Sequence, residues 1–484
     1  MYSLPTIHDL IKIHNTLFEI PRTYRNDMRV PARIFLSEAL LQDVLEDSSL
    51  LQIVNVATLP GIQKYALAMP DIHQGYGFPI GGVAALSVEK GVISPGGIGY
   101  DINCGVRLLA ASISAQDIRK YLDQLATALF NAVPSGVGRG GRLKIKGNEL
   151  DKVLTDGAFH MLSEGYGLPG DLEHCEENGR MEEADPDMIS DKAKNRGHDQ
   201  LGTLGSGNHF LEVQEVKEIY NKDVARTFGL EEGMVTVMIH CGSRGLGHQT
   251  CTDYVREMVP QLDKWDILLP DKELACAPFT SQEGQNYYRA MCASANFAWA
   301  NRHVIGHWTR QTFKNVIGEN VHLRTVYDVS HNIGKKEKHM IDGKLTEVIV
   351  HRKGATRAFG PHRPEVPAEY QATGHPVLIP GTMGTSSYVL VGTAKGMEHA
   401  FGSCCHGAGR KMSRVKAKKA VRGSTLRQEL EARGILIRCE SDPGLAEEAP
   451  LAYKDVDDVV QIVEHAHLAQ RVARLTPLAV IKGG

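Results

Sequence analysis

The chain has 484 residues, of which 42% are hydrophobic and 23% are charged, so it holds enough apolar material for a large folded core. Its net charge of −3 excludes a globally basic nucleic-acid-binding protein, and any such contact must use local basic patches. Nine cysteines, an odd number without the spacing of a small module, argue against a secreted disulfide scaffold. The first residues lack a signal-peptide pattern and no apolar run approaches ~18 residues, so we expect a cytoplasmic protein without a membrane segment.

Glycine-rich segments dominate the first hundred residues. Residues 69–82 carry so much glycine and proline that we predict an irregular loop that shapes a cavity, with Asp71 and His73 as its polar members. Residues 94–99 lead directly to Asp101 and Cys104. This carboxylate and thiol can bind one ion, and a thiolate sulfur can also bridge two ions. Taken alone, the pair is better interpreted as a loop aspartate beside a buried thiol.

The next segments are predicted mainly as surface structure. Ser114 and Asp117 resemble a capping box that opens a helix ending before Pro134. Residues 135–146 form a flexible basic loop, either a solvated surface loop or a contact to a phosphate backbone. The acidic residues 173–187 predict a surface helix and turn.

Three histidines lie in settings that suit metal ligands. His209 follows a Gly-Ser-Gly-Asn segment, and His240 ends an alternating strand pattern over residues 235–239. A second strand pattern, at residues 326–329, precedes His331, and a long helical pattern over residues 281–313 separates the two strands. Together with Asp101 and Cys104, these histidines favour a metal centre over separate structural roles. Thiolate and imidazole ligands by themselves favour Zn²⁺.

A second group of chemical motifs follows residue 380. His406 precedes glycines and an arginine in the segment 403–410, so its imidazole can approach a phosphate and act as a nucleophile toward phosphorus. A fourth metal-binding histidine or a plain turn are the alternatives. Residues 380–387 are typical of a loop that wraps a phosphate or a nucleobase, although they lack a P-loop lysine. The basic segment 411–422 predicts a helix that is either a solvated face or a binding surface.

The last residues favour a docked tail. Residues 456–463 predict a helix, and His467 falls on its apolar face, so we interpret His467 as a packed core histidine. Residues 478–481 are apolar, which suits docking rather than the frayed end expected of a terminal lysine such as Lys482. Because the candidate site residues span most of the chain, one interwoven α+β domain fits better than three independent domains.

Together these motifs resemble the signatures of the RtcB family of RNA-splicing ligases, in the family's order and over nearly the whole chain. The matching segments are Asp-Ile-Asn-Cys-Gly-Val-Arg at 101–107, Gly-Ser-Gly-Asn-His-Phe-Leu-Glu at 205–212, His-Cys-Gly-Ser-Arg-Gly-Leu-Gly-His at 240–248, Ser-His-Asn at 330–332, Cys-His-Gly-Ala-Gly-Arg at 405–410 and Ile-Lys-Gly at 481–483. The resemblance implies a single α+β catalytic domain over residues 1–484, with mixed β-sheets around a central dinuclear metal cleft and helices outside.

The resemblance also implies the chemistry. It predicts joining of an RNA 2′,3′-cyclic phosphate or 3′-phosphate end to a 5′-hydroxyl end with GTP and Mn²⁺, in tRNA splicing or RNA repair. His406 would carry GMP covalently. An archease-type activating protein is a further partner that the family suggests. Activation of the RNA 3′-phosphate as a guanylate anhydride gives the 5′-hydroxyl a group that it can displace.

The resemblance assigns residues to both cofactors. Cys104 would bridge two Mn²⁺ ions, one shared with Asp101 and His209 and the other with His240 and His331. The guanylate contacts would come from Asn208, His209, Phe210, Leu211, Glu212, His331, Asn332, Pro380, Gly381, Thr382, Met383, Ser387, His406, Gly407, Ala408, Gly409, Tyr453 and Lys482.

Two other functions compete with this interpretation. A metal-dependent phosphodiesterase or phosphatase needs the metal ligands and Arg244 but no covalent histidine. A structural zinc module is disfavoured because the ligands are scattered and embedded in glycine-rich loops.

Overall fold

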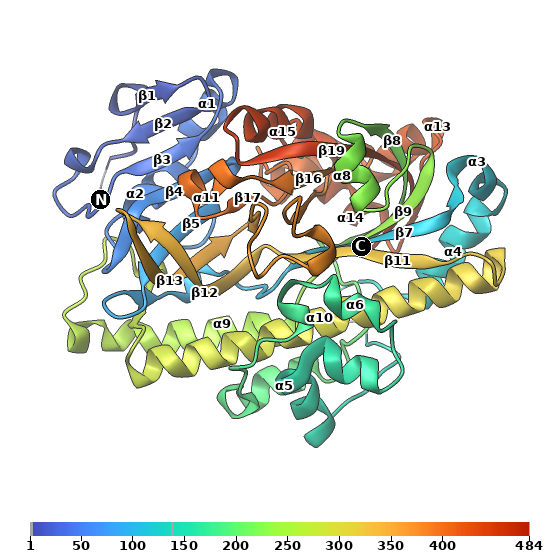
Figure 1. The fold of residues 1–484 in the computed structure, drawn as a ribbon, viewed down its shortest axis with the longest axis horizontal. Coiled ribbons are helices and arrows are strands. Elements are labelled where there is room, and N and C mark those ends of the chain that lie inside the picture. The colour runs from blue at the N-terminus through green and yellow to red at the C-terminus, as the bar shows by residue number, and fades with distance from the viewer. Residues whose placement is uncertain (1–2, 137–139, 484) are drawn as a thin grey trace.

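The computed structural model describes residues 3–136 and 140–483, which form two large β-sheets with helices around them (Figure 1). The first sheet has seven strands, and only its β3–β4 pair is parallel. Its strands, in spatial order, are β1 (Ile11–His14), β2 (Leu17–Ile20), β3 (Ala32–Phe35), β4 (Ile62–His73), β5 (Ile80–Ser87), β13 (Lys344–Lys353) and β12 (Asn332–Ile341).

The second sheet has eight strands and carries most of the candidate site. Its spatial order is β11 (Leu323–Ser330), β7 (Gly105–Ser114), β9 (Met234–Cys241), β8 (Phe210–Ile219), β19 (Ala469–Lys482), β16 (Ser387–Gly392) and β15 (Pro376–Ile379), with β18 (Leu436–Cys439) parallel to the end of β19. Two short pairs complete the strands: β6 (Val92–Ile93) with β10 (Ala277–Pro278), and β14 (Ala355–Arg357) with β17 (Ser403–Cys405).

One long helix, α10 (Gln282–Ile317), runs along the molecule beneath the sheets (Figure 1). Ser281 begins it by accepting a hydrogen bond from the N–H of Gly284, and Gly318 follows its last turn. The remaining helices are α1 (Glu38–Leu45), α2 (Ser49–Val56), α3 (Ala115–Ile118), α4 (Leu122–Ala132), α5 (Asn148–Ser163), α6 (Gly170–Glu173), α7 (Asp191–Gly197), α8 (Lys222–Thr227), α9 (Arg244–Met258), α11 (Ala394–Ala400), α12 (Arg414–Ala420), α13 (Gly423–Ala432), α14 (Asp442–Glu447) and α15 (Val456–His465). Within the described ranges, none of these helices is long and apolar enough to cross a membrane.

The fold confirms the mixed α+β class and several predicted elements. β9 carries His240 near its end, β11 ends directly before His331, and α10 covers the long helical pattern. Ser114 accepts a hydrogen bond from the N–H of Asp117, and α3 and α4 follow as the predicted helix, broken by a short 3₁₀ turn. Docking of the tail is confirmed as well, because β19 is an inner strand of the second sheet.

The prediction of an irregular loop at 69–82 is wrong at both ends. β4 continues to His73 and β5 begins at Ile80, so only residues 74–79 connect strands. Pro70 is tolerated because it lies where the β4–β5 register shifts, and a missing N–H costs least at such an irregularity. Gly81 packs so closely on β4 that an added Cβ would lie 3.0 Å from a carboxylate oxygen of Asp71.

Two other predictions need correction. The predicted surface helix at 173–187 is replaced by two short 3₁₀ turns, Glu176–Gly179 and Pro186–Met188, joined by irregular backbone. Glu176 is buried and pairs with Lys335. His467 is exposed, not packed in the core, since α15 ends at His465 and His467 turns the chain in a left-handed conformation. The predicted basic loop at 135–146 includes residues 137–139, which lie outside the described residues.

Candidate active site

The order of strands in the second sheet gathers the predicted metal ligands. Gly105, directly after Cys104, pairs with Ser330 on one side and with Cys241 on the other. On the next strand, Phe210 pairs with His240. Residues that are far apart in the sequence therefore reach the same edge of one sheet, where antiparallel pairing fixes their spacing.

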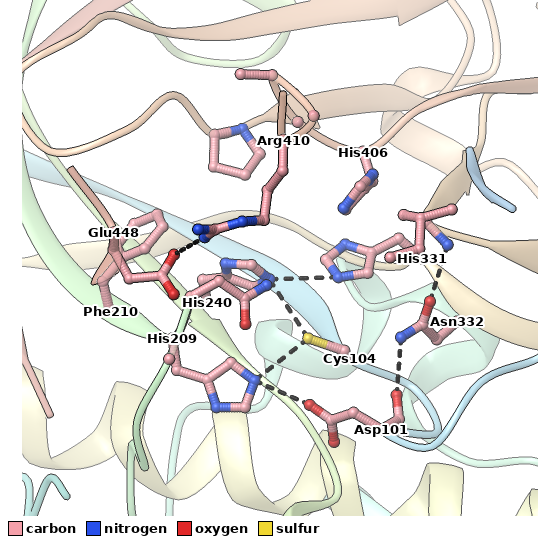
Figure 2. A pocket seen from close by; sticks show the side chains of 18 of the residues that line it. Asp101, Cys104, His209, Phe210, His240, His331, Asn332, His406, Arg410 and Glu448 are labelled. Atoms are coloured by element: carbon pink, nitrogen blue, oxygen red, sulfur yellow. Dashed lines mark hydrogen bonds and ion pairs between the residues drawn. The ribbon is translucent and has the colours of Figure 1, made fainter. Parts of the chain in front are cut away.

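The five predicted ligands form two groups that share one sulfur atom (Figure 2). The Sγ of Cys104 lies 3.4 Å from Nε2 of His209 and 3.4 Å from Nε2 of His240. His209 Nε2 is 2.9 Å from a carboxylate oxygen of Asp101, and His240 Nε2 is 3.3 Å from His331 Nε2. Metal–ligand bonds of ~2.0–2.3 Å in a tetrahedral arrangement place neighbouring donors roughly 3.3–3.7 Å apart. The three distances among Cys104, His209, His240 and His331 fit this range, whereas Asp101 and His209, 2.9 Å apart, must separate slightly to share an ion.

The protonation states also suit a site for cations. Burial and the charge of Asp101 raise the pKa of the Cys104 thiol to about 12, so the thiol must lose a proton to bind a metal ion. Burial holds the pKa of His240 and of His331 well below its usual value, which leaves both imidazoles neutral. His209 donates its Nδ1 proton to the carbonyl of Leu204 at 3.0 Å, which points its Nε2 toward the cluster. Against the effect of burial, Cys241, Cys104 and Asp101 raise the pKa of His209, so Nε2 must also lose a proton to bind a metal ion.

A buried arginine on α10 fixes the backbone behind the ligands. Arg302 donates hydrogen bonds to the carbonyls of Asn103 at 2.7 Å and Cys241 at 2.8 Å, each adjacent to a candidate ligand. The same guanidinium pairs with Asp328 on β11, at 2.7 Å. One side chain thus links the strands that carry Cys104, His240 and His331, and its own hydrogen bonds leave it little freedom.

His406, the candidate nucleophile, is held by a carboxylate from the first sheet. Its Nδ1–H donates to Asp71 Oδ2 at 2.6 Å, and its backbone N–H donates to the same oxygen at 3.1 Å. Asp71 is fully buried. The proton is therefore held on Nδ1, and Nε2 keeps the lone pair that a nucleophile needs. The sequence singled out Asp71 only as a polar member of a cavity wall, and nothing local in the sequence indicates its pairing with His406.

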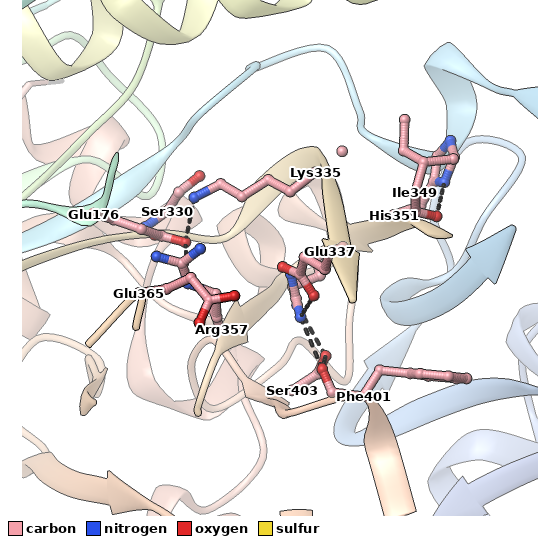
Figure 3. Close-up of polar contacts among 12 residues, drawn as sticks. Glu176, Ser330, Lys335, Glu337, Ile349, His351, Arg357, Glu365, Phe401 and Ser403 are labelled. Carbon is pink, nitrogen blue, oxygen red and sulfur yellow. Dashed lines mark hydrogen bonds and ion pairs between the residues drawn. The ribbon is translucent and has the colours of Figure 1, made fainter. Parts of the chain in front are cut away.

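A buried polar network anchors the strand that leads to His406 (Figure 3). Arg352 donates to Ser403 Oγ at 2.9 Å and forms an ion pair with Glu337 at 2.6 Å. Next to it, Glu176 accepts a hydrogen bond from the N–H of Ser330, which precedes His331, at 2.6 Å. Both the nucleophile and a candidate ligand therefore follow residues that are fixed by buried charges.

A cavity of about 480 Å³ contains the cluster, His406 and most of the predicted guanylate contacts. The predicted residues that line it are Asp101, Cys104, Asn208, His209, Phe210, Glu212, His240, His331, Asn332, Pro380, Gly381, Thr382, Met383, His406, Gly407, Ala408, Gly409, Tyr453 and Lys482. Leu211 and Ser387 do not line it. Leu211 points into the core on the other side of β8, whereas Ser387 begins β16, is buried, and accepts a hydrogen bond from the N–H of Gly381.

Two buried ionisable side chains, Glu212 and Lys482, lie at one wall of the cavity. Burial raises the pKa of Glu212 to about 8, against the opposing effects of Gln214 and Lys482. Lys482, 3% exposed, ends β19 beside Phe210 and donates to the carbonyl of His209 at 3.4 Å. Burial lowers the pKa of Lys482. A carboxyl and an ammonium group placed in this way can bind the edge of a polar ring or a phosphate.

Several wall residues were not assigned from the sequence. Arg410 donates to Glu448 and to the hydroxyl of Tyr453, both at 3.0 Å, so it fixes the ring of Tyr453 in the wall. The side chain of Asn332 is already engaged, since it donates to the carbonyl of Asp101 and accepts from the N–H of Gly354. His73, which the sequence predicted as a polar member of a cavity wall, does line the cavity. The lining residues that the sequence did not assign to the metal or guanylate site include Tyr76, Tyr100, Arg244, His248, Lys353 and Arg414.

Comparison with known proteins agrees with this geometry. Residues 52–483 match the family model described as tRNA-splicing ligase RtcB. The chain is 55% identical to the tRNA-splicing ligase RtcB of Archaeoglobus fulgidus, over 98% of this chain and 99% of that protein. It is 54% identical to the protein of the same name from Thermococcus kodakarensis over the same shares, and 51% identical to the RNA-splicing ligase RtcB of Mycobacterium bovis over 90% of this chain and all of that protein. The chain belongs to the RtcB family of tRNA-splicing ligases and is an RNA ligase.

Proposed function

We propose that this ligase joins RNA 2′,3′-cyclic phosphate or 3′-phosphate ends to 5′-hydroxyl ends, with GTP as the energy source and Mn²⁺ as the metal. The observation that carries the proposal is the pairing of His406 with Asp71 at 2.6 Å inside a cavity that also holds the shared-thiolate cluster. A histidine with a fixed Nδ1 proton serves as a nucleophile, whereas a hydrolase that activates water at metal ions does not require one.

In the proposed first step, His406 Nε2 attacks the α-phosphorus of GTP. A nitrogen–phosphorus bond forms, the bond from the α-phosphorus to the bridging oxygen breaks, and pyrophosphate leaves. Asp71 stabilises the positive charge that develops on the imidazole, because the two groups already share a short hydrogen bond. A 2′,3′-cyclic phosphate is first opened by water, whose oxygen bonds to phosphorus while the bond to the 2′-oxygen breaks and leaves a 2′-hydroxyl and a 3′-phosphate. The RNA 3′-phosphate then takes the guanylate from His406, and the 5′-hydroxyl oxygen displaces GMP to form the new phosphodiester.

In the proposed metal site, Asp101, Cys104 and His209 would hold one ion and Cys104, His240 and His331 would hold the other, since the two groups have the Cys104 sulfur in common. When bound, two divalent cations would offset the negative charge that crowds the reacting phosphates. Carboxylate and phosphate oxygens harden this donor set, which is why we propose Mn²⁺ rather than the Zn²⁺ that sulfur and nitrogen alone favour.

The guanine is proposed to lie against Phe210, Glu212 and Tyr453, with Lys482 nearby. We further propose that the 484 residues act as one catalytic domain, because the groups around the cavity come from both large sheets. An archease-type protein is the proposed activating partner.

Incubation with GTP labelled at the α-phosphorus tests the proposal. We expect acid-labile label on the wild-type protein, as a phosphoramidate requires, and no label on His406→Ala with its metal content unchanged. Intact mass gives the same readout. Removal of the RNA 3′-phosphate by a protein that never takes up label would favour a phosphatase instead and would contradict the ligase mechanism.

A further inference from the structure

Part of the cavity wall takes no role in the proposed guanylate or metal site. Tyr76, Tyr100 and His248 all line the same cavity, and they come from three different segments of the chain. Tyr76 lies on the 74–79 connection between β4 and β5, Tyr100 directly precedes Asp101, and His248 is on α9. None of the three belongs to the strands that carry Phe210 or Lys482.

The three rings contact one another in sequence. The ring centroids of Tyr76 and Tyr100 are 5.3 Å apart in an edge-to-face arrangement. Tyr100 and His248 are nearly parallel, with an interplanar angle of 27° and centroids 6.1 Å apart. These are favourable aromatic geometries, so the rings form one cluster, here called the aromatic platform, beside the candidate metal ligand Asp101. Because the planes of Tyr76 and Tyr100 differ by 67°, a base would stack on the free face of one ring while the others hold that ring in place.

The aromatic platform is open rather than buried in the core. Tyr76 and Tyr100 are half-buried and His248 is exposed, so part of their ring surface faces the cavity and solvent. Open aromatic rings beside a reaction centre for phosphate groups suit a flat, unstacked nucleobase, because every base has a face that stacks on such rings.

The segment that carries Tyr76 is held in place from below. Lys353 donates hydrogen bonds to the carbonyls of Tyr76 and Phe78, and the N–H of Gly77 donates to Glu273 at 2.9 Å. Gly77 has a φ of 70°, and an added Cβ would lie 2.3 Å from the carbonyl oxygen of Glu273. A segment fixed at several points holds the ring of Tyr76 ready for a ligand, at little entropic cost on binding.

We propose that Tyr76, Tyr100 and His248 form a stacking platform for the nucleobase of an RNA end that is being joined. This inference rests on the proposed function and adds to it a subsite for the RNA. Two ends meet at the cavity, the 3′-phosphate end and the 5′-hydroxyl end, and both present the same chemistry to an aromatic ring. Stacking at the last nucleotide would bring the reacting phosphate toward the cluster and His406.

The experiment combines loss of the ring with loss of the base. Wild-type protein, Tyr76→Leu and Tyr76→Phe, each supplied with Mn²⁺ and GTP, are given RNA strands with an intact terminal nucleotide or an abasic terminal ribose, at the 3′-phosphate end or at the 5′-hydroxyl end. The readouts are kcat and KM for ligation, together with label transfer to His406, which needs no RNA. Tyr76→Phe is the matched control because it keeps the aromatic ring.

We expect the abasic ribose at one end to raise the wild-type KM for RNA by about 5- to 150-fold, the range that one stacked base contributes. Tyr76→Leu should show a similar rise with intact RNA and little further rise with the abasic strand, while label transfer stays normal. Tyr76→Phe should resemble wild type. The RNA end at which Tyr76→Leu no longer distinguishes an intact nucleotide from an abasic ribose is the end that the platform binds.

The platform is refuted if Tyr76→Leu ligates intact RNA with the wild-type KM, or if it remains as sensitive as wild type to a missing base at both ends. Should Tyr76→Leu fail to fold, His248→Leu on the exposed surface of α9 allows the same comparison. A wild-type protein that joins no RNA at all would instead refute the proposed function, so the two failures are distinguishable.

Discussion

Replacement of Asp71 by asparagine isolates the charge behind the candidate nucleophile. The substitution keeps the size of the side chain and one carbonyl oxygen, but it removes the negative charge that accepts two hydrogen bonds from His406. Asp71 is completely buried, and its other oxygen has no hydrogen-bond partner among the described residues, so an amide NH₂ placed there would be unsatisfied. If the amide turned around, its NH₂ would face Nδ1 and drive the ring proton to Nε2, the atom that must attack.

The expected loss follows from these contacts. A charge-assisted hydrogen bond in a buried site contributes roughly 1.5–3 kcal/mol, which corresponds to about 10- to 150-fold in the rate of label transfer from GTP to His406. Stabilisation of the wrong tautomer would extend the loss to about 10⁴-fold. The assay is single-turnover label transfer at saturating GTP, with metal content measured alongside. Asp43→Asn, which removes an exposed carboxylate on α1, is the matched control.

A change of less than threefold in Asp71→Asn would refute the reasoning, because the imidazole would then hold its tautomer and its charge without the carboxylate. A large loss of rate that accompanies loss of metal would also contradict it, since Asp71 belongs to neither group of candidate ligands.

Four further predictions concern the cluster and the guanylate wall. Cys104→Ser should weaken both metal positions together, measured by competition titration, and loss of only one equivalent would contradict the shared sulfur. Because the Cys104 thiol has its pKa raised to about 12 by burial, wild-type metal affinity should rise about tenfold per pH unit near neutrality. Lys482→Met should cut label transfer to His406 severely with little change in melting temperature, and a normal rate would refute this role. Glu212, whose pKa burial raises to about 8, must lose a proton to accept two N–H groups of guanine, so GTP affinity should increase from pH 6 to pH 8 in wild type. Equilibrium binding of Glu212→Gln should lack this increase.

Local sequence patterns predicted a residue's position correctly where that position depends only on the helix or strand that carries the residue. The alternation of β-branched apolar residues with Thr236 and Met238 located the strand that carries His240, because such residues suit a buried strand, and β9 is buried on both faces. The apolar tail before Lys482 indicated docking for a similar reason. His467 was misplaced because the helix periodicity was extended two residues beyond the end of α15.

Other features depend on contacts that no local pattern contains. Asp71 and His406 are 335 residues apart in the sequence, and their hydrogen bond exists only because β4 of one sheet lies beside the segment that follows β17. The strands at both ends of 69–82 were missed since glycine normally weakens a strand, whereas here Gly81 permits close packing of β5 on β4. Glycine content alone does not distinguish these two cases.

The position of β19 has a consequence for how the site is assembled. Lys482 pairs with Phe210 on β8, while the other edge of β19 pairs with β16, so the last strand is inserted between segments that are already far apart in the sequence. His240 lies on β9, whereas Cys104 directly precedes β7 and His331 directly follows β11, so all three belong to strands beyond β8 that do not pair with β19. We therefore expect the metal cluster to tolerate loss of the ammonium group at residue 482. The proposed guanylate wall lacks the ammonium group of Lys482 until β19 has paired. We therefore expect the proposed guanylation of His406 to depend on the whole sheet, whereas the metal cluster does not.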